Sequence, residues 1–397
     1  MKPVSVGILK DTSLPMLGLH GLHVAFRGLP GVDVVAQVDA NPDGIAEKMA
    51  VTGAKRHYRS YQEMLDHEAL DIMVICSRHP GDHFAPIRAA AERGVHLYCE
   101  KPLSVSLEEA DDIVSLAEKH QIKIGMAHPA RYGPAYRTMK TMIDAGEIGR
   151  PLTAVGRGKC DHRGGGEDLI VLGTHILDLQ HFLFGTPETV FADVQADGRP
   201  IERSSRCETV EPLGPVAGDS IFASFNYPRG VRCTFESRRD LRRAESKHLF
   251  MGLTVMGSEG ALSIRFNDIM EPVYYLRISR IAAPVEDFSE YIEVPVRRNR
   301  EIPGAEPLDY SLCGTKDIPR DPLFIEAGRF AAWDLIKAIE EDRQPVSNVF
   351  NAHQTIEMIY GIYASHLEGR IIRFPLHKRT HPLLCRVGRR PTVGGAK

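Results

Sequence analysis

The chain has 397 residues, more than one hydrophobic core usually serves, so we expect two domains. Hydrophobic residues make up 43% of the chain and charged residues 25%, the proportions of an ordinary globular protein, and no stretch approaches the roughly 20 apolar residues of a membrane span. The formal net charge of −3 gives no reason to expect a nucleic acid or an acidic membrane as partner.

The seven cysteines are scattered through the chain, and none forms a CxxC pair. An odd, dispersed set favours reduced thiols over a disulfide framework. The first apolar run is interrupted too early to indicate a secretory signal. We therefore expect a cytoplasmic protein.

Residues 1–128 alternate between two hydrophobic patterns. Short apolar runs that predict strands lie at residues 4–9, 32–38, 71–77, 95–99 and 122–126, and helical patterns lie at residues 19–29, 84–92 and 106–120. Strands that alternate with helices predict a doubly wound parallel sheet, whose usual ligand is a nucleotide. The fold class is therefore α/β in this half of the chain.

The loop after the first strand lacks the GxGxxG fingerprint of dinucleotide-binding turns. Asp11, Thr12 and Ser13 offer polar side chains to a cofactor instead, although a turn without a ligand is the alternative. Asp39 ends the second strand, where a carboxylate accepts from a ribose 2′-hydroxyl and repels a 2′-phosphate, which favours NAD over NADP. Asp39 could equally cap the turn that follows it.

Polar residues also follow the later strands. Ser77 and His83 come after the strand at 71–77, and Glu100 and Lys101 come after the strand at 95–99. Ligands of open α/β sheets bind at the carboxyl ends of the strands, so we expect all four residues in the cofactor crevice. Pro102 fixes the backbone after Lys101, which makes this lysine the first candidate for chemistry. A surface turn with an exposed Glu-Lys pair is the plain alternative.

The second half of the chain has strands without helices between them. Alternating runs recur at residues 152–156, 190–195, 220–227, 231–237, 249–256, 261–266 and 272–278, which predicts antiparallel pairing. Two amphipathic helices follow at 323–341 and 352–366, and we expect them to pack on the first domain or on the sheet. Residues 297–320 are expected to form a long loop, and the basic residues 378–397 a loose arm.

His175 and Asp178 form a second chemical pair on the helix expected at residues 172–184. A spacing of three residues places them on one helix face. An imidazole with a near-neutral pKa can accept a hydroxyl proton, and a carboxylate can orient it. A core histidine or a weak surface pair would show the same spacing.

Four ordered segments resemble the Gfo/Idh/MocA oxidoreductase family. They are the Glu100-Lys101-Pro102 tripeptide, residues 143–151, residues 173–178 with Gly185 ending their helix, and the C-terminal segments 342–345, 352–366 and 368–370. The resemblance implies a nicotinamide cofactor in an N-terminal Rossmann domain (residues 1–128). It also implies an α+β domain at residues 129–376, whose large, mostly antiparallel sheet carries the substrate pocket on one face and the contacts of a homodimer or homotetramer on the other. In such enzymes the lysine of the tripeptide commonly contacts both nicotinamide and substrate, and Lys101 takes that role here.

One position departs from the family pattern. An aspartate usually precedes the histidine by four residues, and this chain has Val171 there. Asp168, or Asp161 with His162, could supply the missing carboxylate. We therefore expect Lys101, His162, Asp168 and His175 to bind substrate.

The leading hypothesis is an NAD(P)-dependent oxidoreductase for a carbinol of a sugar or polyol, with Lys101, His175 and Asp178 as catalytic residues. A redox-neutral glycosidase, lyase or epimerase on a retained cofactor is one alternative, and a non-enzymatic binding or sensing module is another. The histidines show no metal-binding spacing, so no metal is expected.

Overall fold

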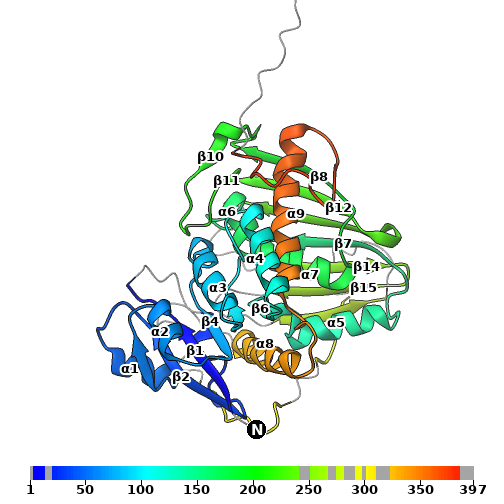
Figure 1. Cartoon of the computed structure of the whole chain (residues 1–397). Helices are drawn as coiled ribbons and strands as arrows, with labels where there is room; N and C mark the ends of the chain where they lie inside the picture. The colour runs from blue at the N-terminus through cyan, green and yellow to red at the C-terminus, as the bar shows by residue number, and fades with distance from the viewer. Residues whose placement is uncertain are drawn as a thin grey trace, which may run out of the picture.

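The computed structural model describes residues 3–13, 20–240, 251–266, 274–280, 291–296, 301–309 and 322–384. Two β-sheets organise these residues, a parallel one near the N-terminus and a larger one built mostly from the second half of the chain (Figure 1). The fold class expected from the sequence is confirmed in both parts.

The first sheet has six parallel strands in the order β3-β2-β1-β4-β5-β6. Their bounds are β1 Val4–Leu9, β2 Val32–Val38, β3 Arg56–Tyr58, β4 Ile72–Ile75, β5 His96–Cys99 and β6 Ile124–Met126. This order reverses direction between β1 and β4, the position where doubly wound sheets bind dinucleotides. Five of the six strands were predicted, and β3 was missed because its three residues are too short and polar to give a pattern.

The two faces of this sheet are covered by different parts of the chain. Successive residues of β4 divide between them: Ile72 and Val74 join one apolar cluster, whereas Met73 and Ile75 join the other. The helices around the sheet are α1 Ile45–Thr52, α2 Tyr61–His67, α3 Phe84–Ala91, α4 Leu107–Lys119 and α8 Pro322–Glu340. Helices α2, α3 and α4 cover the Met73 face, and α8 covers the Ile72 face although it lies some 200 residues later in the sequence (Figure 1).

The helix expected over residues 19–29 is wrong. The described part of this segment holds one short 3-10 helix, η1 (Leu22–Val24), followed by turns. Its backbone hydrogen bonds run from residue i to residue i−3, as from Val24 N to Gly21 O at 3.1 Å. Gly21 and Gly28 have φ values of 84° and 66°, and this left-handed backbone interrupts the α-helix that the apolar spacing predicted.

The second sheet has the order β17-β16-β15-β14-β7-β13-β12-β8-β18, with β9 beside β8. Its strands are β7 Pro151–Arg157, β8 Thr189–Ala196, β9 Arg199–Pro200, β12 Ser220–Asn226, β13 Arg232–Arg238, β14 Gly252–Gly257, β15 Ala261–Phe266, β16 Tyr274–Ser279, β17 Ile292–Glu293 and β18 Ile372–Arg373. Pairing is antiparallel except between β7 and β13. The antiparallel architecture predicted from alternating residues is therefore confirmed.

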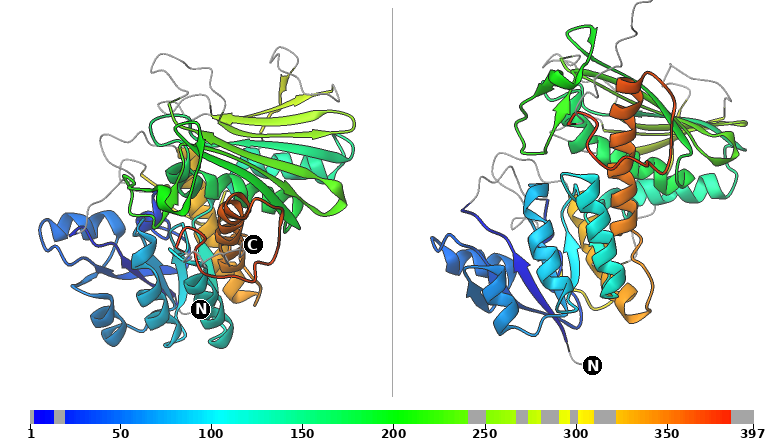
Figure 2. Two further views of the ribbon diagram at one scale, coloured as in Figure 1. Left: turned by 90° about the horizontal axis from the view of Figure 1, so that it is seen from above. Right: turned by 45° about the horizontal axis from the view of Figure 1, so that its top comes forward.

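Helices lie on the face of this sheet that is directed toward the first domain (Figure 2). They are α5 Pro134–Asp144, α6 Gly166–Val171, α7 Gly173–Phe184 and α9 Val349–Glu368. Helix α9 contacts both β8 and α4, so it joins the two domains, and the Tyr360 hydroxyl accepts the first backbone N–H of α4 at 3.1 Å. The opposite face is open and exposes Phe191 and Phe222.

The strands β10 (Arg206–Cys207) and β11 (Val216–Ala217) form a separate small hairpin, and Glu211 in the loop between them pairs with Arg78, after β4. Five cysteines lie in the described residues, and all are free thiols, whereas Cys313 and Cys385 lie outside them.

None of the helices in the described ranges combines the length and apolar character that a bilayer crossing requires. The loop expected at 297–320 and the arm expected at 378–397 lie largely outside these ranges.

Candidate active site

Strand β5 delivers Lys101 to the carboxyl edge of the first sheet, in the gap between the two domains. The side chain is 3% exposed, and its Nζ donates to the backbone carbonyl of Val171 at 2.9 Å. Burial lowers the pKa of Lys101 to about 8, and the nearby Glu100 carboxylate only partly opposes this effect. The ammonium is therefore charged but poorly solvated near neutral pH.

Glu100 is held in place by the N-terminal domain. Its carboxylate accepts the backbone N–H of Lys101 at 2.7 Å and lies against the His20 imidazole. Burial alone would raise the pKa of Glu100, but His20 and Lys101 together lower it to about 2. Glu100 is therefore ionised, and it fixes the backbone from which Lys101 projects.

His175 lies in the first turn of α7, just after the junction of α6 and α7 that Lys101 contacts. Leu172 separates these two helices, and the Val171 carbonyl just before the break accepts both Lys101 Nζ and the Thr174 hydroxyl. Burial lowers the pKa of His175 well below its ordinary value, and the charge of Lys101 lowers it further. The imidazole is therefore neutral and able to accept a proton.

Asp178 is bound by Arg131 in the structure. Its buried carboxylate receives three hydrogen bonds from the Arg131 guanidinium at 2.8–3.0 Å. Burial opposes the charged form, but Arg131 holds the pKa of Asp178 below its ordinary value. The charge of the Asp178 carboxylate is therefore neutralised by Arg131.

His128 lies next to both Asp178 and His175. Its Nδ1 lies 3.6 Å from Asp178, and its ring meets the His175 ring edge to face with centroids 5.7 Å apart. The imidazole is 1% exposed, and neither ring nitrogen has a hydrogen-bond partner in the described part of the chain. His128 and Arg131 were missed in the sequence, although the end of a parallel strand at Met126 was a usable signal for both.

Asp168 lies on α6 below the cleft. Its carboxylate accepts the Lys159 backbone N–H and the Ser237 hydroxyl, each at 2.7 Å, and burial raises its pKa to about 6. Gly158 permits this approach, because a Cβ there would lie 2.0 Å from the Asp168 carboxylate. Asp168 therefore anchors the loop of residues 158–165 that carries Lys159.

The other candidate for the missing carboxylate is Asp161, with His162 beside it. Asp161 accepts the backbone N–H of Arg163 at 2.9 Å, and His162 is exposed. Neither they nor Asp168 bonds to Lys101. In this chain a backbone carbonyl, that of Val171, takes the lysine hydrogen bond.

Asp39 organises the start of the cofactor crevice. Its buried carboxylate accepts the backbone N–H and hydroxyl of Thr12 and pairs with Lys48 Nζ at 3.0 Å. Burial would raise its pKa, but these donors lower it. Asp11 accepts the backbone N–H groups of Ser13 and Ala40, so it ties the first loop to the end of β2. Residues 14–19 of this loop lie outside the described ranges.

Ser77 and His83 lie in the loop after β4. The Ser77 hydroxyl donates to Asp82 at 2.7 Å. His83 is fully buried, and its ring nitrogens face the carbonyl oxygens of Ser77 and Leu103 at 2.8 and 3.1 Å. His83 therefore supports the loop from beneath, and Ser77 lies at the crevice itself.

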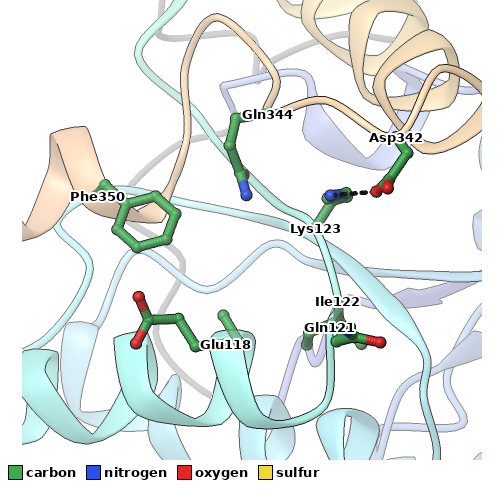
Figure 3. A pocket seen from close by; sticks show the side chains of 8 residues that line it. Glu118, Gln121, Ile122, Lys123, Asp342, Gln344 and Phe350 are labelled. Atoms are coloured by element: carbon green, nitrogen blue, oxygen red, sulfur yellow. Dashed lines mark hydrogen bonds and ion pairs between the residues drawn. The ribbon is translucent and has the colours of Figure 1, made fainter.

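A pocket of about 440 Å³ opens at the opposite end of the first sheet (Figure 3). It lies between α4, the start of β6 and the segment that joins α8 to α9, and Figure 3 shows the Lys123–Asp342 ion pair at its rim. Lys123 precedes β6, whereas Lys101 follows β5. Because the strands are parallel, the two lysines lie at opposite edges, and this pocket is separate from the candidate active site.

Two family models match the chain. The model of the oxidoreductase family with an NAD-binding Rossmann fold matches residues 19–128, and the GFO/IDH/MocA C-terminal domain model matches residues 136–263. In the described residues no group of three or more His, Cys, Asp or Glu side chains is arranged to hold a metal ion.

Curated relatives cover part of the chain. D-apiose dehydrogenase from Paraburkholderia graminis is 31% identical over 171 residues, which is 41% of this chain and 45% of that protein. Inositol 2-dehydrogenase/D-chiro-inositol 3-dehydrogenase from Lactiplantibacillus plantarum is 27% identical over 187 residues, 45% of this chain and 51% of that protein. The matched part of the chain thus spans about half the length of these relatives.

Solved structures share the fold over nearly the whole chain. Levoglucosan dehydrogenase in complex with NADH and levoglucosan superposes with a TM-score of 0.70 at 20% identity, covering 94% of this chain and 100% of the other. Aldose-aldose oxidoreductase from Caulobacter crescentus, complexed with glycerol, gives a TM-score of 0.68 at 16% identity, with coverages of 94% and 99%.

Proposed function

This chain belongs to the Gfo/Idh/MocA oxidoreductase family, and from that premise we propose an NAD-dependent oxidoreductase that acts on a carbinol of a sugar or polyol. The dehydrogenases named among its relatives support this activity. The observation that carries the proposal is the hydrogen bond from Lys101, at the carboxyl edge of a doubly wound sheet, to the Val171 carbonyl, four residues before His175. The charge of Lys101 also lowers the pKa of His175.

The crevice offers the chemical groups that a dinucleotide needs at its ribose and nicotinamide ends. Thr12 provides a hydroxyl after β1, and Asp39 provides a carboxylate after β2. Glu100 and Lys101 provide charge after β5. These residues would hold NAD, which when bound supplies a hydride acceptor. The chain supplies position and charge.

Lys101 and His175 have different roles toward the substrate. The Lys101 ammonium donates a hydrogen bond to the carbinol oxygen and stabilises the negative charge that develops on it. The neutral His175 imidazole accepts the hydroxyl proton as the carbon loses hydride and the carbonyl forms. The packing of the two domains excludes water from Lys101, which is 3% exposed, and this strengthens both interactions.

Replacement of His175 by asparagine tests the proposal. We expect kcat for polyol oxidation to fall about 10²- to 10⁴-fold, the usual contribution of a general base, while NADH binding is retained. NADH fluorescence titration and a screen of sugars and polyols for NADH formation provide the two measurements. The matched control is His67→Asn, on an exposed histidine of α2.

Two results would count against the proposal. Failure of the wild-type protein to bind NAD(H) or NADP(H) would exclude this chemistry. Substrate turnover without net NADH formation would instead indicate the redox-neutral reaction on a retained cofactor.

The cofactor preference depends on Asp39. We expect Asp39→Ser to shift the ratio of NADH to NADPH dissociation constants about 10- to 100-fold toward NADPH, the value of one charge-assisted hydrogen bond. The substitution removes a negative charge and leaves Lys48 Nζ available to a 2′-phosphate. Fluorescence titration with both cofactors measures the ratio. Asp33→Ser on β2 is the control, and an unchanged ratio in Asp39→Ser would refute the assignment.

We also propose that the chain forms a homodimer or homotetramer through the open face of the large sheet. Phe191 on β8 and Phe222 on β12 are 49% and 46% exposed on that face. Burial of such aromatic side chains is a common source of interface stability.

A further inference from the structure

We propose that His128 is a positioning residue for His175, and that its ring closes the inner side of the His175 imidazole against water. This inference rests on the proposed function, in which His175 accepts the carbinol proton. It begins from a buried histidine to which the hydride-transfer step assigns no role.

His128 lies deeper in the molecule than His175. It follows β6 at the carboxyl edge of the first sheet, and its side chain is 1% exposed, whereas His175 is only half-buried. The two rings meet edge to face, with centroids 5.7 Å apart and an angle of 87° between their planes, the usual contact geometry of paired aromatic rings. The side of His175 that His128 covers is therefore closed by a ring that solvent does not reach.

His128 makes this contact as a ring and not through a hydrogen bond. Neither Nδ1 nor Nε2 has a hydrogen-bond partner in the part of the chain that the structure describes. The Asp178 carboxylate lies 3.6 Å from Nδ1, but it accepts the hydrogen bonds of Arg131. A phenyl ring of similar size at position 128 should therefore cover His175 equally well.

The ring of His128 is neutral. Burial has the largest effect on its pKa and lowers it. Four charged groups act on this pKa in opposite directions: Asp178 and Glu100 raise it, and Arg131 and Lys101 lower it. Because His128 adds no charge at neutral pH, its effect on His175 is to exclude water.

His175 is surrounded by groups that disfavour its protonated form. Burial lowers its pKa most, and the positive charges that lower it further come from separate elements: Lys101 after β5, His128 after β6, His20 before η1 and Lys159 after β7. Water beside the ring would solvate the imidazolium and raise this pKa toward the ordinary value. Exclusion of water by His128 thus keeps His175 neutral and able to accept a proton.

The test measures the pKa of His175 by NMR titration of the full-length protein labelled with ¹⁵N-histidine, with His175→Asn to identify the signal. We expect His128→Ala to raise this pKa by about one pH unit or more, a tenfold gain in proton affinity. The space it opens is lined by polar groups and therefore admits water. His128→Phe should keep the pKa of His175 low, because the phenyl ring fills the same space.

The pH profile of kcat/KM for polyol oxidation is the second measurement. In His128→Ala the decline of kcat/KM on the acidic side should move to higher pH by the same amount as the pKa, and His128→Phe should follow the wild-type protein. A residue that only stabilised the fold would leave the position of this decline unchanged. His128→Val, which opens a smaller space, provides the same comparison if His128→Ala folds poorly.

The matched control is His381→Ala, which removes another buried imidazole. His381 is 4% exposed and packs on Tyr360 and Tyr363, so its loss should leave the pKa of His175 unchanged. The inference is overturned if the small variants at position 128 leave that pKa unchanged, or if His128→Phe raises it as much as they do. The expected NMR shifts in a protein without hydride transfer would refute the proposed function alone. Hydride transfer that depends on His175, with no NMR shift in the variants, would refute this inference alone.

Discussion

Lys101→Met is expected to reduce kcat/KM for hydride transfer at least about 10³-fold and to raise the free energy of unfolding by about 2 kcal/mol. The activity falls because the cation that stabilises the developing oxyanion is removed. The stability rises because methionine fills the same buried space without a charge. Few substitutions combine so large a functional loss with a gain in stability.

The size of the stability gain follows from the pKa of Lys101, which burial lowers to about 8. Relative to the ordinary lysine pKa near 10.4, this corresponds to a penalty of about 3 kcal/mol for the charged form. Loss of the hydrogen bond to the Val171 carbonyl offsets about 1 kcal/mol of the gain.

The sign of the pH dependence is fixed by the same shift. Between pH 8 and about 10.4 the unfolded chain keeps the lysine proton that the folded chain has lost, so wild-type stability rises with pH in that window. The advantage of Lys101→Met should therefore be largest below pH 8 and decrease above it. Oxidation by the wild-type protein should decline above pH 8 as the ammonium is lost.

Urea unfolding from pH 7 to 10 and a pH profile of kcat/KM test both statements. Lys119→Met, which removes an exposed lysine, is the control and should change neither quantity appreciably. A Lys101→Met protein that keeps its activity would show that position 101 is structural. A Lys101→Met protein that is less stable than the wild type would show that favourable interactions of the ammonium outweigh the cost of its burial.

The strands of this chain could be predicted because their signal is local. Each strand of the large sheet from β12 to β16 in the described ranges coincides with an alternating or apolar run, and β4 and β5 are short apolar runs. The failure at residues 19–29 is also local in origin: the apolar spacing is helical, but Gly21 and Gly28 take left-handed conformations that the spacing does not encode. The packing of α8 on the first sheet could not be predicted from local pattern, because it joins residues that lie far apart in the sequence.

The candidate site residues could be proposed from local patterns in the sequence, but their hydrogen-bond partners could not. Ends of parallel strands identified Glu100 and Lys101, and helical spacing placed His175 and Asp178 on one face. The sequence could not show that Asp178 turns to Arg131, because that partner lies 47 residues earlier on another element. Nor could it show that a backbone carbonyl, which every residue carries, would replace the missing side chain at Val171.

Arg131→Met is expected to lower the free energy of unfolding by about 3 to 5 kcal/mol, the usual cost of breaking a buried ion pair on one side. Asp178 is fully buried and would keep its charge without the guanidinium that now donates three hydrogen bonds to it. His128, 3.6 Å away, has a pKa lowered mainly by burial, so it does not replace the lost cation at neutral pH. The segment that carries His128 and η3 (Pro129–Arg131) would lose its tie to α7.

The double variant Arg131→Met/Asp178→Leu distinguishes the cost of an unpaired buried carboxylate from the cost of losing the whole ion pair. Because the second substitution removes the stranded carboxylate, we expect it to recover a large share of the lost stability in urea unfolding at pH 7. In Arg131→Met alone, burial would raise the pKa of Asp178, so the defect should shrink as the pH is lowered and the carboxylate takes up a proton. The control is Arg88→Met, which opens an exposed ion pair on α3 and should cost less than about 1 kcal/mol.

A further variant, Asp178→Asn, distinguishes a catalytic Asp178 from one that positions the helix. If Asp178 oriented His175 directly, Asp178→Asn would alter the pH profile of kcat at nearly unchanged stability. The observed geometry instead predicts that Asp178→Asn lowers stability and leaves the shape of that profile in place, because the carboxylate binds Arg131 and lies next to His128, whose ring packs on His175. A shifted pH profile in a stable Asp178→Asn protein would show that Asp178 takes a direct part in the reaction.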